Sequence, residues 1–174
     1  MSNIPVTKPR SRANIIRLVK TLKSIIGFNE LNFPVCEFIE NILPQLDSDF
    51  TYEYVDSSDL PDRTYAYYDP INNVMKIDQN VYLGACNGNP RDRFTIAHEI
   101  GHYFTIDEIQ FARGETKDIP AYINPEWQAN AFASELLMPS EKIYNMSVDS
   151  IVKKCNVSAT AASIALKNAK KPNY

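Results

Sequence analysis

The sequence has few cysteines and no long apolar run, and each shortage excludes a class of protein. The three cysteines, Cys36, Cys86 and Cys155, are far apart and form no C-x-x-C motif. They therefore argue against a disulfide framework or a thiolate zinc site, and they predict free thiols in a reducing compartment. No stretch approaches the roughly 18 apolar residues of a membrane span, and the polar segment 1–12 lacks the apolar region of a signal peptide. We therefore expect a soluble, cytoplasmic protein.

Acidic residues are absent from the first 29 positions, which carry six basic groups although the net charge of the chain is −3. A basic segment can bind nucleic acid or an acidic partner. Here the basic residues alternate with apolar ones at helical spacing, which favours the solvated face of an amphipathic helix. We expect no nucleic-acid partner and no membrane partner.

Histidine is the scarcest reactive residue, because the chain has only His98 and His102. Both belong to the stretch His98-Glu99-Ile100-Gly101-His102, an H-E-x-x-H motif. On a helix, four residues turn through about 400°, so the two imidazoles share one face and can hold one zinc ion. Glu99, about 100° round from His98, can reach a water on that ion. The alternative is two ordinary histidines on an amphipathic helix, but the sequence on either side also fits a metal site.

Zinc needs a third protein ligand, and no histidine remains to provide it. Glu108 follows the motif, but Thr105 stands where a glycine would be needed to turn the chain back to the metal. On the next predicted helix Glu126 and Asn130 share a face, whereas Glu135 lies about 180° from Glu126. Glu126 is therefore the predicted ligand, and Asn130 is a candidate partner for a histidine N–H. The alternative is a first-turn glutamate favoured only by the helix dipole.

The pattern of the chain predicts an α+β fold of 174 residues in one domain. A small sheet that contains antiparallel strands packs on the active-site helix, with helices before and after it. We expect a loose arm and helices in 1–45, a catalytic core in 50–139 and C-terminal helices in 140–174. The predicted helices are 11–26, 35–43 (ended by Pro44), 90–104, 126–137, 147–155 and 158–169. The predicted strands are 50–55, 64–68 and 74–77. Segments 1–10 and 111–120 are expected to be irregular.

The last two predicted helices have the spacing of a helix-turn-helix. The second of them lacks the Arg, Asn and Gln side chains that read base edges. We therefore favour packing on the domain, or docking of a protein substrate, over DNA binding.

Two blocks of sequence around the predicted ligands carry a resemblance to a known family. Residues 93–102 read R-F-T-I-A-H-E-I-G-H, and residues 126–139 read E-W-Q-A-N-A-F-A-S-E-L-L-M-P. They resemble the ImmA/IrrE metallopeptidases, whose patterns are R-F-T-x-A-H-E-x-G-H and then E-x-x-A-N-x-F-A-x-x-L-L-M-P. The resemblance covers about residues 50–166. It implies a zincin of the gluzincin type, with His98, His102 and Glu126 as zinc ligands and Glu99 as the catalytic carboxylate.

The resemblance also implies a function. Family members cleave a helix-turn-helix repressor, often encoded beside them on a mobile element, on a phage or in a stress-response operon, and cleavage turns genes on. The expected cofactor is Zn²⁺, and an activating partner fits the narrow activity that a cytosolic protease needs. The alternatives are a non-catalytic protein- or DNA-binding regulator on the same fold and a small-molecule amidohydrolase.

Two features of the predicted mechanism stay open in the sequence. A donor to the oxyanion is usual in such sites, and the candidates are Tyr65, Tyr67, Tyr103 and Tyr122. Strand 74–77 could pair with an extended substrate if it forms the sheet edge at the cleft, and the alternative is an ordinary hairpin strand.

Overall fold

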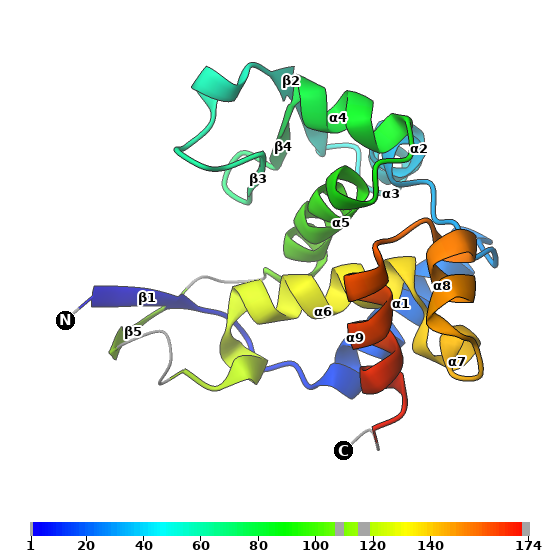
Figure 1. Ribbon diagram of the computed structural model, residues 1–174. Helices are drawn as coiled ribbons and strands as arrows, with labels where there is room; N and C mark the ends of the chain where they lie inside the picture. Colours follow the sequence, from blue (N-terminus) through cyan, green and yellow to red (C-terminus); the bar gives the residue numbers. More distant parts are fainter. Residues whose placement is uncertain (1, 107–109, 115–118, 172–174) are drawn as a thin grey trace.

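The computed structural model describes residues 2–106, 110–114 and 119–171 (Figure 1). Two crossing helices, α5 (Pro90–Thr105) and α6 (Pro125–Leu137), lie at its centre. Each starts with an asparagine whose side chain accepts hydrogen bonds from two backbone N–H groups of the first turn, followed by a proline that needs no such partner. The predicted starts of both helices are confirmed.

Gly101 allows α5 and α6 to pack closely. A Cβ atom at this position would lie 2.7 Å from the backbone oxygen and 2.9 Å from the Cα of Ala129 on α6. Neither backbone atom can move without shifting a helix. A mid-helix glycine costs roughly 1 kcal/mol relative to alanine, and the close helix crossing accounts for its presence here.

We expect Gly101→Ala to lower the free energy of unfolding by about 1–3 kcal/mol, because the new methyl group overpacks the crossing. Urea unfolding of the two proteins measures this difference. Gly84→Ala on α4 is the matched control, since the three atoms nearest to its added Cβ all belong to the side chain of Asp92, which can rotate. Equal stability losses in the two variants would show that the crossing is not tight.

The small sheet has the strand order β2 (Thr51–Val55), β4 (Val74–Asp78), β3 (Ala66–Asp69). Strands β3 and β4 form the predicted antiparallel hairpin, while β2 runs parallel to β4. The suggestion that 74–77 forms a sheet edge is wrong, because β4 is the central strand. Its side chains are buried at Val74, Met75, Ile77 and Asp78, so both of its faces are covered. The edge that lies beside α5 is β3.

The N-terminal segment is not a loose arm, and 111–120 is not entirely a loop. Strand β1 (Ser2–Val6) pairs antiparallel with β5 (Gln110–Gly114). The two partners are more than 100 residues apart, so no local turn signal announces them. Helix α1 (Arg12–Ile25) follows, and Ser11 caps its N-terminus in a capping box with Asn14.

The second predicted helix continues past Pro44, contrary to expectation. It consists of α2 (Val35–Glu37), a π-helical turn η1 (Phe38–Ile42) and α3 (Leu43–Leu46). The backbone N–H of Leu43 donates to the carbonyl of Phe38, five residues back. This wider turn places Pro44 in the first turn of α3, where its missing N–H and its ring are tolerated.

Helices α7 (Ser140–Ile143), α8 (Val148–Cys155) and α9 (Ala159–Ala169) complete the right side of Figure 1. Ser147 and Ser158 cap α8 and α9 as predicted. Ile151, Cys155 and Ala162 are fully buried in the core that also contains α5 and α6. The C-terminal pair therefore packs on the domain, which was the favoured prediction.

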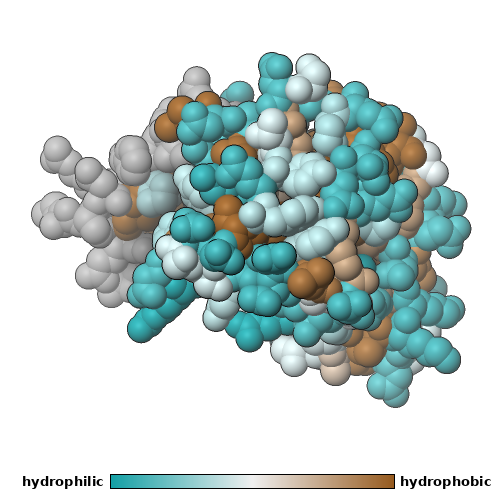
Figure 2. All heavy atoms as spheres, turned by 90° about the horizontal axis from the view of Figure 1, so that it is seen from above, coloured by the Kyte–Doolittle hydropathy of each residue, from teal (hydrophilic) through white to brown (hydrophobic). Residues whose placement is uncertain are grey.

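The remaining elements are α4 (Gln79–Cys86) and the short turns η2 (Ser57–Asp59) and η4 (Ala121–Ile123). Seen from above, hydrophilic side chains separate small groups of hydrophobic ones (Figure 2). Among the helices of the described residues, none has the length and hydropathy needed to cross a membrane.

Candidate metal centre

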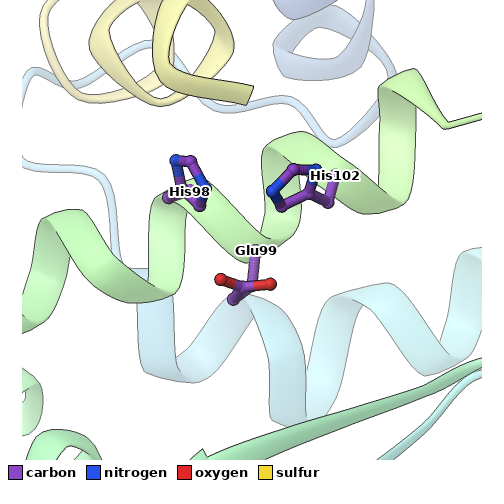
Figure 3. Close-up of side chains that lie close together, drawn as sticks. All are labelled: His98, Glu99 and His102. Carbon is purple, nitrogen blue, oxygen red and sulfur yellow. The ribbon is translucent and has the colours of Figure 1, made fainter. Parts of the chain in front are cut away.

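The centre is built on α5, which presents both histidines from one face (Figure 3). The ring centroids of His98 and His102 lie 4.6 Å apart with their planes at 85°. His102 is buried, and the side chain of His98 is 18% exposed. The helical arrangement that the motif predicts is therefore present.

Glu126 meets both histidines from the first turn of α6. Its Oε2 atom lies 3.2 Å from Nε2 of His98, and its Oε1 atom lies 3.3 Å from Nε2 of His102. Hydrogen bonds with His102 and then with His98 hold the pKa of Glu126 well below its ordinary value, against the effect of burial. The carboxylate is therefore ionised, which is the form that ligates a metal.

Glu135, the other carboxylate of α6 that was considered as a ligand, hydrogen-bonds to Ser140 rather than to a histidine. Glu135 is buried on α6 and accepts hydrogen bonds from the backbone N–H and the hydroxyl of Ser140, at 3.0 and 3.1 Å. This is the opposite phase that helix geometry predicts. Glu108 lies outside the described residues.

The donor set fits a zinc ion. Two ligand atoms at about 2.0 Å from a tetrahedral zinc are about 3.3 Å apart, close to the two measured N···O separations. Oδ1 of Asn130 lies 3.0 Å from Nδ1 of His98. Since an amide oxygen only accepts, Nδ1 carries a proton. Nε2 donates to Glu126 when it is also protonated, and it is the nitrogen that would bind a metal after losing that proton. Asn130 thus has the place predicted for it.

The His98 imidazole is strongly influenced by its surroundings. Burial lowers its pKa, but the hydrogen bond with Glu126 and the charge of Glu99 outweigh this effect and raise it overall. Nδ1 of His102 is buried and has no hydrogen-bond partner among the described residues. Its Nε2, which faces Glu126, is the nitrogen available to a metal.

Glu99 is nearly buried beside the two histidines, with 7% of its surface exposed. One ligand atom from each of the three side chains lies within 4.8 Å of the others. Oε2 of Glu99 accepts a hydrogen bond of 3.0 Å from the backbone N–H of Tyr68 on β3. Burial raises the pKa of Glu99, although the charges of His102 and His98 act in the opposite direction. A carboxylate with a raised pKa is suited to take up a proton and release it again.

A cleft of about 360 Å³ opens in front of these side chains. Its walls include β3, the start of α6 and the segment Pro5–Thr7 from the N-terminus. This N-terminal wall was missed in the sequence, because only the long-range pairing of β1 with β5 places it there.

Of the four tyrosines left open by the sequence, Tyr67 lines the cleft. Burial and then the charge of Asp69 raise its pKa, so its hydroxyl is protonated and can donate. The hydroxyl of Tyr103 instead donates to Asp47 at 2.7 Å. Tyr65 lies under the guanidinium of Arg91, 5.3 Å from the ring centroid.

Comparison with known proteins agrees with this geometry. Residues 46–167 match the sequence profile of the peptidase M78 family, described as the IrrE N-terminal-like domain. The chain belongs to this family. It is a family of zinc-type peptidases, so the predicted ImmA/IrrE relationship is confirmed and a metallopeptidase-type role is supported.

Among solved structures, the chain is similar in fold to a Mycobacterium tuberculosis transcriptional regulator. The TM-score is 0.56 at 12% sequence identity, over 91% of this chain and 48% of the regulator. The chain thus spans about half the length of that protein, and the likeness supports the predicted α+β zincin-like fold. A search of curated proteins gave no match.

Proposed function

We propose that this M78 family member is a zinc-dependent endopeptidase that cleaves a specific regulatory protein. One observation carries the proposal: the Glu126 carboxylate contacts both imidazoles of an H-E-x-x-H helix, beside a nearly buried Glu99. His98, His102 and Glu126 would hold the metal. A structural or purely regulatory site would not need a general base such as Glu99, which lies beside both histidines and accepts from the Tyr68 backbone N–H.

The residues of the chain have distinct parts in peptide hydrolysis. When zinc is bound, it supplies a Lewis acid that lowers the pKa of a water and polarises the scissile carbonyl. Glu99 takes the proton of the attacking water on its carboxylate, which the hydrogen bond from the Tyr68 N–H to Oε2 holds in place. Glu99 then delivers that proton to the leaving amine.

Tyr67 is the proposed donor to the developing oxyanion, since it lines the cleft and its hydroxyl is protonated. The edge strand β3 lies along the same cleft. An extended substrate can therefore pair with β3, in the role that sequence reasoning gave to 74–77.

The proposed substrate is a helix-turn-helix transcriptional repressor whose cleavage derepresses genes. The resemblance of residues 93–102 and 126–139 to the ImmA/IrrE patterns supports this substrate class. The structural similarity to a protein described as a transcriptional regulator agrees with a role in gene control.

Removal of the metal tests the proposal directly. The product of the adjacent gene is the first candidate substrate. We expect a chelator to stop its cleavage and stoichiometric zinc to restore it, with electrophoresis and mass spectrometry of the products as the readout. A non-catalytic regulator on the same fold predicts the opposite result, namely intact repressor and a partner affinity that does not change with chelator.

A further inference from the structure

The described residues form a second cavity, which is larger than the metal cleft. It is a groove of about 500 Å³ between α5, α6 and α9. Each helix presents one face to it: α9 contributes Thr160, Ile164 and Asn168 at intervals of four residues, and α6 contributes Trp127, Ala131 and others. A trough with helical walls of this kind accommodates another helix.

The groove is apolar and carries positive charge. Phe94, Trp127 and Ile164 are among its apolar residues, and Ile164 remains 57% exposed. Arg12 and Arg91 also line it, and no aspartate or glutamate does so among the described residues. This charge contrasts with the net charge of −3 of the whole chain.

The groove is connected to the metal centre through the Asn130 side chain. Asn130 lines the groove, and its Oδ1 atom is the partner of His98 Nδ1 at 3.0 Å. A segment bound in the groove would therefore lie beside the proposed catalytic cleft without occupying it.

We propose that this groove docks an amphipathic helix of the protein substrate that carries acidic side chains beside its apolar face. The apolar face covers Trp127 and Ile164, and the carboxylates pair with Arg12 and Arg91. Charge complementarity selects this occupant over a neutral or basic helix. That the occupant is a substrate rests on the proposed peptidase function, whereas the binding itself needs no zinc.

Trp127 provides the readout, because it is the single tryptophan of the chain and it lines the groove. Its fluorescence can be followed while the full-length protein is titrated with a designed amphipathic helix of about 18 residues made of leucine and glutamate. The matched probe has lysine in place of glutamate. All titrations are done in chelator, so that the result is independent of peptidase activity.

We expect the glutamate peptide to bind at least about ten-fold more tightly than the lysine peptide. Arg91→Glu and the double variant Arg12→Glu/Arg91→Glu should reverse this preference, and Ile164→Asp should weaken both peptides. Arg17→Glu is the matched control, since it reverses an exposed charge on the helix that carries Arg12 and does not line the groove.

Equal binding of the two peptides, or a preference that survives Arg91→Glu, would overturn the proposal even if the protein cleaves its repressor. A groove that binds the glutamate peptide in a protein without peptidase activity would instead leave the docking site standing and remove the proposed function. Arg91 and Ile164 are both exposed, so these variants are expected to fold.

Discussion

Replacement of Glu99 by glutamine should lower kcat/KM for peptide cleavage by at least about 10³-fold while zinc remains bound. Glutamine has nearly the same shape as glutamate, and its amide oxygen can still accept the hydrogen bond from the Tyr68 N–H. It cannot take up a proton from water. The loss should therefore fall on the chemical step, with zinc stoichiometry measured by mass spectrometry or absorption unchanged.

Folding is a separate matter from catalysis in this variant. Glu99 is nearly buried and burial raises its pKa, so an uncharged glutamine removes a desolvation cost. We expect an unfolding temperature at least as high as that of the wild type. Glu53→Gln, at an exposed position on β2, is the control and should cleave normally. Undiminished cleavage by Glu99→Gln would falsify the assigned role.

The features that sequence analysis predicted correctly depend on residues close together in the chain. The starts of α5 and α6 follow from asparagine–proline pairs, because a cap is a contact within one turn. The face shared by His98 and His102 follows from helix phase. The same phase separates Glu126 from Glu135, and of these two glutamates Glu126 is the one in contact with the histidines.

The features that were missed or misassigned depend on long-range pairing. The cleft wall at Pro5–Thr7 exists because β1 pairs with β5, and no local pattern encodes such a pairing. Strand β4 is central because β2 pairs in parallel with the edge of β4 that does not face β3. The hairpin sequence alone does not indicate this second partner. Proline ends an α-helix because it lacks an N–H group for the hydrogen bond to the preceding turn. A π-helical turn precedes Pro44, so this rule wrongly predicts a helix end there.

Glu126→Ala should reduce zinc affinity by at least about 10²-fold with little effect on the fold. Loss of a residue that only hydrogen-bonds to a metal ligand lowers metal affinity by about 10- to 100-fold. Loss of a ligand itself should lower the affinity at least as much. The Glu126 side chain is 66% exposed, and the first-turn hydrogen bonds to Asn124 use its backbone rather than its carboxylate. Competition titration with a chromogenic chelator measures the affinity.

Glu135→Ala gives the opposite pair of effects and so serves as the matched control on the same helix. Its carboxylate is buried and holds the backbone N–H and hydroxyl of Ser140, so we expect a loss of about 1–3 kcal/mol in unfolding free energy and unchanged zinc affinity. The two variants separate a ligand from a structural glutamate, because each should change the quantity that the other leaves alone. If the Glu126→Ala variant kept its zinc affinity, Glu126 would lie near the metal without being a ligand, and the assignment from helix phase would be wrong. The third position would then have to come from another part of the chain, and Glu108 would be the first residue to test.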